Sequence, residues 1–381
     1  MSQVAEWLLD PEVAYLNHGA FGALPRQVWE AAGELRLEME RDPAELLIRQ
    51  LPRRLDEVRG RLCELLRAEE AGAVFVANAT AGTATVISSL AAPFEAGDEL
   101  LTTDHRYGAI AAQLERSARE RGTTSVVAHV PLDVTSPTEV VAAITERITP
   151  RTKLLVVDGI ASLSGFVFPV REIAAAAHEL GVPVLIDAAH CPGQVDVDVL
   201  GSGVDFWVGN LHKWINSPRG AGFLYVAPRW RQTIRPQSAS HGFAGSLHEA
   251  FDWTGTFDPV TILAVPAALD FWQRHGGWDE VRATQRSIVD DGAARVAKAL
   301  GTEVAIADEF TAAMRIIELP KVLDADTARS LETTLAESYR IELSLMPLHG
   351  KSWARVCGQI YNEPSDYERL GEALVALLQT E

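Results

Sequence analysis

Short apolar runs alternate with longer amphipathic stretches through the middle of the chain. The runs occupy residues 73 to 77, 153 to 159, 183 to 189 and 222 to 227. Runs of this length predict buried strands, whereas the stretches between them, with apolar positions three or four residues apart, predict helices. Strands that alternate with helices form a mostly parallel sheet covered on both faces, so the pattern predicts an α/β fold.

The pattern differs on either side of this region. Residues 26 to 70 keep helical spacing among many Arg and Glu residues, which predicts a helical, peripheral arm. Beyond about residue 275 the pattern predicts a helix at 278 to 300, a strand at 314 to 320, a helix at 325 to 337 and a final strand with a helix. We therefore expect a large domain at 26 to 274 and a smaller α+β domain that combines residues 1 to 25 with 275 to 381.

The composition narrows the possible functions. The 381 residues carry a formal net charge of -18, which repels phosphate backbones and acidic membranes, so we expect neither nucleic acid nor a membrane as partner. Cys63, Cys191 and Cys357 are too few and too scattered for a disulfide framework or a zinc site with paired ligands, and no metal is expected. The chain also lacks a secretory pattern and an apolar run of membrane-spanning length, which favours a cytoplasmic protein.

Lys213 is the lysine whose surroundings point most clearly to chemistry. It lies in the segment DFWVGNLHKWINSPRGAGFLYV (205 to 226), between an apolar run and a glycine-rich turn. Most lysines are exposed and solvated. A lysine flanked by Trp207, Trp214 and Ile215 would instead be partly desolvated, which lowers the pKa of an amine and makes it nucleophilic enough to form a Schiff base.

Asp187 ends the apolar run in VLIDAAHCPGQ, 26 residues before Lys213 (213 minus 187). A carboxylate at the end of a buried strand needs a cationic partner. By itself such an acid could equally be a metal ligand or a helix cap. A protonated pyridine nitrogen would also serve as the partner, and this pairing keeps the ring of pyridoxal 5'-phosphate (PLP) an electron sink. Followed by Lys213, the acid therefore indicates a PLP enzyme.

Seven segments, in this order, resemble the class V aminotransferase family of PLP fold type I, and especially its isopenicillin N epimerase-like and cysteine S-conjugate lyase branch. They are YLNHGAFGALP (15 to 25), ANATAGTATV (77 to 86), TTDHRYGAI (102 to 110), DAAH (187 to 190), NLHK (210 to 213), WTGTFDP (253 to 259) and RVCGQIYN (355 to 362). The resemblance runs essentially end to end. It implies the aspartate aminotransferase-like fold, with a large, mostly parallel seven-stranded sheet domain and a smaller α+β C-terminal domain.

The resemblance also implies which residues hold the cofactor. Ala79 and Thr80 would receive the phosphate at a helix start, where small residues make an anion site, although Thr80 could be a plain N-cap. The other cofactor residues it implies are Asn210 and His212 at the phosphate, Ser162 at the phenolic oxygen, His190 beside Asp187, and either His105 or Tyr107 over the ring. Gly255 and Thr256 would reach the phosphate of the partner subunit's cofactor, which implies a homodimer with shared active sites.

For the amino-acid substrate, the resemblance assigns Arg355 to the α-carboxylate, and a planar fork of donors suits that group. Asn17 and His18 would line the substrate side. The alternatives from the residues alone are an ordinary ion pair for Arg355, a turn residue for Ser162 and a core histidine for His18.

The branch implies several reactions at Cα, with Lys213 as the acid-base group. Carbon–sulfur β-elimination from a cysteine S-conjugate is favoured, because His105 to Gly108 resemble the lyase branch, where Tyr107 could act near the leaving group. Epimerisation of an amino acid or peptide and decarboxylation-coupled oxidative deamination of a cysteine S-conjugate remain alternatives. Transamination is less favoured. Cysteine desulfuration is disfavoured because SLMPLHGKSWAR (344 to 355) contains no cysteine. The non-enzymatic alternative is an inactive PLP-fold regulatory protein, against which Lys213 and Asp187 argue.

Overall fold

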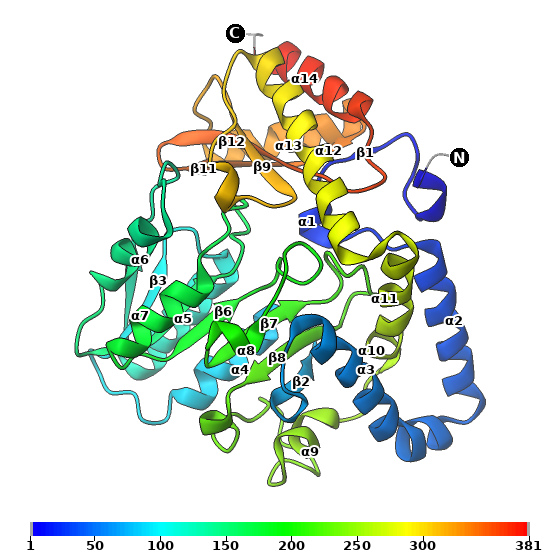
Figure 1. Cartoon of the computed structure of the whole chain (residues 1–381), viewed down its shortest axis with the longest axis vertical. Helices are drawn as coiled ribbons and strands as arrows, with labels where there is room; N and C mark the ends of the chain where they lie inside the picture. The colour runs from blue at the N-terminus through cyan, green and yellow to red at the C-terminus, as the bar shows by residue number, and fades with distance from the viewer. Residues whose placement is uncertain (1–2, 379–381) are drawn as a thin grey trace.

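The computed structural model describes residues 3–378, and its largest element is a seven-stranded sheet (Figure 1). The strands lie across the sheet in the order β2 (Ala73–Val76), β8 (Gly222–Val226), β7 (Phe206–Asn210), β6 (Val184–Asp187), β5 (Thr152–Asp158), β3 (Glu99–Thr103) and β4 (Thr124–Ala128). From β7 to β4 all neighbours are parallel, whereas β8 runs antiparallel to both β2 and β7. The predicted mostly parallel sheet is confirmed.

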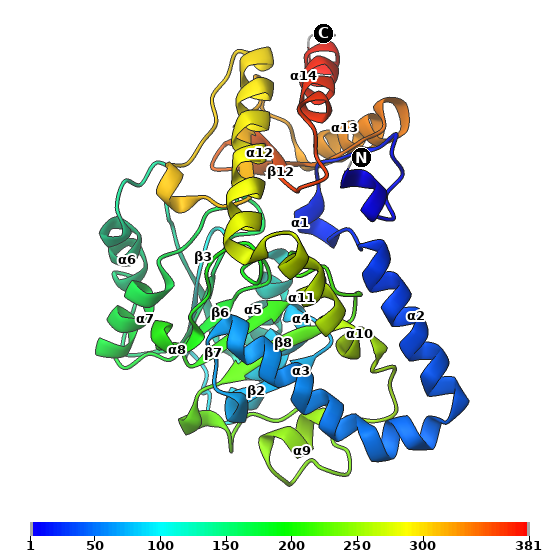
Figure 2. The same cartoon turned by 45° about the vertical axis from the view of Figure 1, so that its right-hand side comes forward.

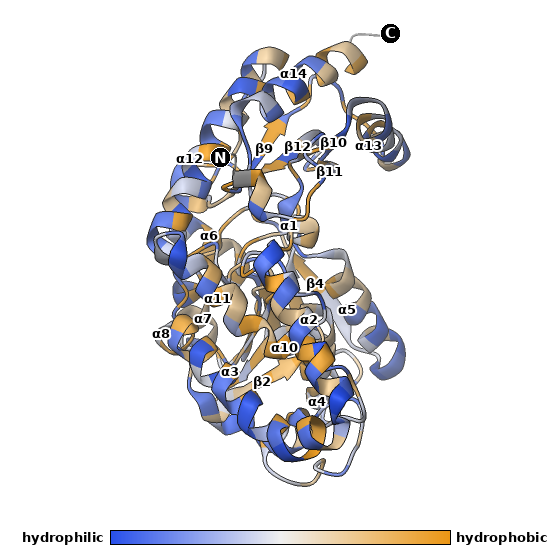
Figure 3. Ribbon diagram, turned by 90° about the vertical axis from the view of Figure 1, so that its right-hand side faces the viewer, coloured by the Kyte–Doolittle hydropathy of each residue, from blue (hydrophilic) through white to orange (hydrophobic). Residues whose placement is uncertain are grey.

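Helices cover both faces of this sheet because its strands are apolar on both sides. Val156 and Val208 face one layer, whereas Val157 and Trp207 face the other. The first layer is α4 (Ala79–Leu90), α5 (Gly108–Arg121) and α9 (Leu247–Asp252). The second includes α3 (Leu51–Leu66), α6 (Pro137–Thr145), α7 (Val170–Glu179), α8 (Val199–Ser202), α10 (Val260–Leu263) and α11 (Val265–Arg274). Figure 3 shows the apolar strands enclosed by helices whose outer sides are polar.

The segment predicted as one peripheral helical arm, residues 26 to 70, is divided in the structure. Helix α2 (Arg26–Arg41) runs along the outer side of the molecule (Figure 2) and ends before Pro43, because a residue that precedes proline avoids the helical conformation. A π-helical turn (Glu45–Gln50) then leads into α3, whose Leu55 and Leu62 are buried in the main core. The arm is therefore peripheral only in its first half.

A second, smaller unit lies above the large sheet in Figure 1. It contains an antiparallel sheet in the order β11 (Ser344–Leu348), β12 (Lys351–Cys357) and β9 (Met314–Glu318), with α12 (Gly277–Leu300), α13 (Ala325–Tyr339) and α14 (Pro364–Leu378). These elements confirm the predicted helices and strands beyond residue 275 and share a separate apolar core.

The N-terminal segment contacts both units. β1 (Ala14–Tyr15) pairs in parallel with β10 (Ile341–Glu342) of the smaller unit, whereas Trp7 and Ala23 belong to the core of the larger one. The domain bounds expected from the sequence stay a prediction. No helix within residues 3–378 is long and apolar enough to cross a bilayer.

Candidate active site

Three neighbouring strands of the large sheet end in polar residues at the same edge. β5 ends at Asp158, β6 at Asp187 and β7 at Asn210, and Asp158 is the direct register partner of Asp187. The N-terminus of α4 meets this edge, since the backbone N–H of Ala79 donates to Asn210 Oδ1 at 2.8 Å. The carboxyl edge of a doubly wound sheet is where such folds bind ligands.

A cavity of about 190 Å³ opens at this edge. Nine of the predicted residues line it: Ala79, Thr80, Tyr107, Ser162, Asp187, His190, Asn210, His212 and Lys213. The remaining lining residues were not predicted for the cofactor: Ala20, Phe21, Asn78, Asp158 and Ala189. The structure thus gathers segments that lie almost 200 residues apart in the sequence around one small space.

Lys213 lies on this cavity with only 9% of its surface exposed. Burial lowers the pKa of its amine to about 8, because the loss of solvation outweighs the opposing negative charge of Asp187. Its Nζ lies 2.9 Å from Nε2 of His190. Burial, together with the positive charge of Lys213, also holds the pKa of His190 well below its ordinary value, so this imidazole is neutral near pH 7. The site therefore presents an amine that loses its proton easily.

The two carboxyl groups at the strand ends are both buried. Burial raises the pKa of Asp187, and burial together with the charge of Asp187 raises the pKa of Asp158 well above its ordinary value. A cation placed beside Asp187 would favour its ionised form. Asp158 is the functional candidate that sequence reasoning missed, although the acid that closes the run at 153 to 159 was a visible signal.

The N-terminus of α4 and His212 also line the cavity. Asn78 caps α4 by accepting a hydrogen bond from Ala81 N–H at 2.9 Å, and Asn210 Oδ1 accepts a hydrogen bond from Ala79 N–H. The Ala79 amide is therefore engaged within the chain, and the contact of Ala79 and Thr80 with the phosphate stays a prediction. His212 adds a buried Nδ1 that has no hydrogen-bond partner within residues 3–378. Such a set suits an anion.

Arg355 of β12 is almost fully buried beside Asn17 and Ser162. Its Nη2 donates to Asn17 Oδ1 at 2.8 Å and its Nη1 donates to the backbone carbonyl of Ser162. Its Nε is buried without a hydrogen-bond partner among the described residues. The positive charge of Arg355 contributes to the low pKa of both Lys213 and His190. A substrate carboxylate beside Arg355 would therefore reduce the repulsion between this arginine and the protonated forms of the two residues.

Three residues predicted to bind the cofactor, His105, Gly255 and Thr256, do not line the cavity. His105 is fully buried, with Nδ1 at 2.9 Å from Ser164 Oγ and Nε2 at 2.7 Å from the Val130 carbonyl oxygen, so its nitrogens serve the protein interior. Of the two candidates for the ring face, Tyr107 is the one that lines the cavity. Gly255 and Thr256 lie beyond α9 and do not reach the cavity of the same chain.

His18, predicted on the substrate side, is placed in the core instead. Its Nε2 donates to the Lys213 carbonyl oxygen at 3.1 Å, and its Nδ1 lies 2.9 Å from the Tyr361 hydroxyl. Burial lowers the pKa of His18 to about 3, so it stays neutral and holds the backbone of Lys213 in place. The alternative of a core histidine fits this position.

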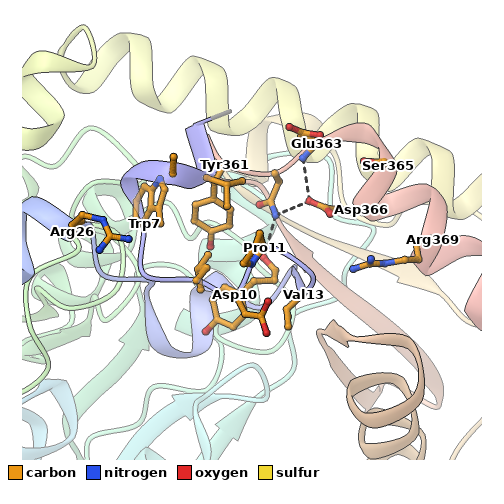
Figure 4. Close-up of a pocket in the computed structure, with 15 residues that line it drawn as sticks. Trp7, Asp10, Pro11, Val13, Arg26, Tyr361, Glu363, Ser365, Asp366 and Arg369 are labelled. Carbon is orange, nitrogen blue, oxygen red and sulfur yellow. Dashed lines mark hydrogen bonds between the residues drawn. The ribbon is translucent and has the colours of Figure 1, made fainter. Parts of the chain in front are cut away.

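A larger hollow of about 570 Å³ lies between the N-terminal segment and α14 (Figure 4). Asp366 accepts hydrogen bonds there from Glu363 N–H and Asn362 Nδ2 at 3.1 and 3.4 Å. None of the predicted cofactor residues lines this hollow. Its size therefore does not make it the better candidate, because it lacks a buried amine and a paired acid.

The cavity at Lys213 fits PLP in its donor set. The buried Lys213 amine suits the aldehyde, the Asp187 carboxyl suits a pyridinium nitrogen, and Thr80 with the unpaired His212 Nδ1 suits the phosphate. Burial raises the pKa of both strand-end acids, and a pyridinium beside Asp187 would favour its ionised form.

Comparisons with known proteins agree with this assignment. The chain is 33% identical to isopenicillin N epimerase from Amycolatopsis lactamdurans over 387 residues, which cover 97% of the chain and 96% of that protein. It is 29% identical to L-cysteine desulfhydrase from Arabidopsis thaliana over 400 residues, which cover 96% and 88%.

Solved structures of the cystine C–S lyase C-DES share the fold. One is a mutant with glycine covalently linked to its PLP cofactor, with a TM-score of 0.85 at 21% identity over 98% of this chain and 99% of that one. The other, in complex with cysteine persulfide, has a TM-score of 0.82 at 22% identity over 96% and 97%. The family model described as Aminotransferase class-V matches residues 14–349, so the chain belongs to the class-V aminotransferase family, whose members imply a PLP cofactor.

Proposed function

We propose that this class-V PLP enzyme cleaves the carbon–sulfur bond of a cysteine S-conjugate by β-elimination. The observation that carries the proposal is the pairing, on one cavity, of the desolvated Lys213 amine with the partly exposed Tyr107. The backbone N–H of Tyr107 is close enough to Asp158 to oppose the rise in the pKa of that carboxyl, and both residues line the cavity. Two proton-transfer groups from different elements therefore border the same small space.

Each group has a distinct task in an elimination. PLP, when bound, supplies the electron sink that acidifies the Cα–H bond of an amino acid. Lys213 takes the Cα proton, and the electron pair released there expels sulfur from Cβ. Tyr107 donates a proton to the departing thiolate. Hydrolysis of the remaining three-carbon fragment yields pyruvate and ammonia, so one thiol, one pyruvate and one ammonia form for each substrate and water consumed.

Arg355 and Asn17 support the binding of the substrate. The Arg355 guanidinium lies beside the cavity, with a planar edge that can turn to a carboxylate, and Asn17 holds one of its nitrogens. A carboxylate held there would lie on the same side as Lys213, whose pKa responds to the charge of Arg355. This arrangement supports an α-amino acid as the substrate class.

The structure gives no support to persulfide chemistry by a cysteine of this chain. β11 and β12 form a tight hairpin whose turn residues, His349 and Gly350, both have positive φ, so no long loop precedes Arg355. Cys63, Cys191 and Cys357 are all buried, and burial raises the pKa of each thiol. A buried thiol of raised pKa is a poor nucleophile.

Epimerisation at Cα is the second candidate, favoured by the end-to-end similarity to isopenicillin N epimerase. It needs Lys213 on one side of Cα and another proton donor on the opposite side, and Tyr107 would then donate to carbon instead of sulfur. The two candidates share the first proton transfer and differ in whether a β-substituent leaves.

The test is an assay of purified, PLP-loaded protein with L-cysteine and a panel of cysteine S-conjugates. Pyruvate, ammonia and released thiol are followed together with exchange of the Cα proton for deuterium. Pyruvate in equal amount to thiol supports the lyase. Exchange or inversion without pyruvate supports the epimerase, and aldehyde with carbon dioxide indicates decarboxylation-coupled oxidative deamination. A protein that stays colourless after PLP is added would contradict every one of these reactions.

A further inference from the structure

A histidine–aspartate–histidine cluster lies outside the cofactor cavity, where the two units of the molecule meet. It consists of Asp104, His129 and His349, and the side-chain ligand atoms of the three residues all lie within 4.8 Å of one another. Asp104 and His129 follow the paired ends of β3 and β4, since Thr103 is the register partner of Ala128. His349 comes from the turn of the β11–β12 hairpin, which belongs to the smaller unit.

Both imidazoles point at the same carboxylate oxygen. His129 Nδ1 lies 2.5 Å and His349 Nε2 lies 2.7 Å from Asp104 Oδ2, and the two rings lie 4.7 Å apart between centroids. The second carboxylate oxygen, Oδ1, accepts the backbone N–H of Val130 at 3.0 Å. This hydrogen bond fixes the carboxylate and directs Oδ2 toward the space between the histidines, as outer contacts do for metal ligands.

We propose that this cluster binds a zinc-type divalent cation through Asp104, His129 and His349. Two imidazole nitrogens and one carboxylate oxygen are the donor set of a three-ligand zinc site, with a fourth position left for water. The His129 side chain is 66% exposed, and the cluster borders a cavity of about 590 Å³, so water reaches it. Magnesium and calcium favour sites made of oxygen alone, so the two histidines select a transition-metal ion.

Small rotations of the exposed imidazoles make room for the ion. Bonds of about 2.0–2.2 Å in a tetrahedron place ligand atoms roughly 3.3 Å apart. The two histidine nitrogens, now 2.5 and 2.7 Å from Asp104 Oδ2, would therefore withdraw from it by roughly 0.6 to 0.8 Å. His349 is held by its hairpin turn and by an edge-on contact with His105, so His129 makes most of the adjustment.

Such an ion would join two segments that lead into the cofactor cavity. Asp104 precedes Tyr107 by three residues, and the hairpin that presents His349 continues through β12 to Arg355. A cation bridging them clamps the smaller unit to the carboxyl edge of the large sheet. Binding of the ion and stabilisation of the chain do not depend on which reaction the enzyme catalyses.

The experiment uses full-length, PLP-loaded protein without an affinity tag, treated with a chelator and titrated with zinc chloride by calorimetry. One zinc ion per chain and a higher melting temperature are expected. His129→Ala and His349→Ala should each weaken binding by more than the roughly 10- to 100-fold that loss of an outer-shell partner costs. His241→Ala, which removes an exposed histidine elsewhere, should bind zinc as the parent does.

Folding of each variant is checked by its visible cofactor absorbance and its circular dichroism. His129 is so exposed that its variant tests the site even where His349→Ala perturbs the hairpin. The visible spectrum of bound cobalt then reports whether the coordination is tetrahedral. The proposal is overturned by the absence of stoichiometric binding, or by binding that His129→Ala and His349→Ala leave at the strength of His241→Ala.

Discussion

At the scale of single residues, burial explains why Lys213 differs from an ordinary lysine. Its pKa of about 8 lies below the ordinary value of 10.5, so the neutral amine forms as the pH rises through about 8. We predict that the rate at which cofactor-free protein captures PLP increases with pH up to about 8 and then levels off. Stopped-flow absorbance measures this rate. A rate that still rises steeply above pH 9 would show that the amine is not desolvated.

Tyr107 gives a second prediction at this scale, which rests on the proposed elimination. Replacement by Phe removes the proton donor to the leaving sulfur, so kcat for an alkyl thiol conjugate should fall by about 10²- to 10⁴-fold. The loss should shrink for aryl thiol conjugates, which leave readily as anions. Exchange of the Cα proton and the cofactor absorbance should persist. Equal losses of kcat for alkyl and aryl thiol conjugates would show that Tyr107 does not protonate the leaving sulfur.

The burial of a candidate residue could be predicted from the sequence where the evidence is local. Lys213 and Asp187 each lie beside an apolar run, so their burial could be predicted from their neighbours. The sequence could not decide whether His105 or Tyr107 borders the cofactor. The conformation of the turn after β3 determines which of the two side chains faces the cavity. The partnership of Asn17 with Arg355 joins positions 338 residues apart, and no local pattern carries that information.

At the scale of elements, the position of α4 depends on one glycine. A Cβ added to Gly82 would lie 2.3 Å from Val208 Cγ2, so the helix would be displaced from β7. We predict that Gly82→Ala weakens PLP binding and lowers stability by about 1–3 kcal/mol, as overpacked core sites do. Gly60→Ala in α3 is the matched control, because its Cβ meets only ordinary contacts with Glu70.

The control should stabilise the chain by about 0.5–1 kcal/mol, since alanine is the better helix former. Urea unfolding and PLP titration measure both variants. Equal behaviour of the two would mean that the packing of α4 on β7 does not set the cofactor site. Periodicity predicted this helix, but not how closely its glycine face approaches the sheet.

At the scale of the whole molecule, the cluster proposed to bind zinc illustrates a limit of sequence reasoning. The expectation of no metal, which stays a prediction, followed from the spacing of the cysteines, whereas Asp104, His129 and His349 carry no ligand motif. They meet only because β3 pairs with β4 and a hairpin 245 positions beyond Asp104 folds back over them. The fold class can be predicted from the order of helices and strands along the chain. A site shared by two units can be predicted only when the placement of one unit relative to the other is known.

The homodimer remains a proposal, and the surface of the single chain supports it. Large apolar side chains are exposed along the N-terminal part, with exposed fractions of 62% for Phe21, 56% for Trp29 and 71% for Ile48. Arg36 of α2 bonds Asp258 at 2.8 Å, which joins this surface to the segment that carries Gly255 and Thr256. Large exposed apolar side chains are typical of the surfaces that subunits bury between them.

We predict that the chain sediments as a dimer and that Ile48→Asp weakens association by at least about a hundredfold, because an unpaired carboxylate would be buried. Activity should fall in proportion to the remaining dimer, since each cavity would lack the partner's Gly255 and Thr256. Val322→Asp is the control, because Val322 is also 71% exposed but lies in the smaller unit. Sedimentation at several concentrations gives the association constant. A monomer that keeps full activity would show that one chain completes its own site.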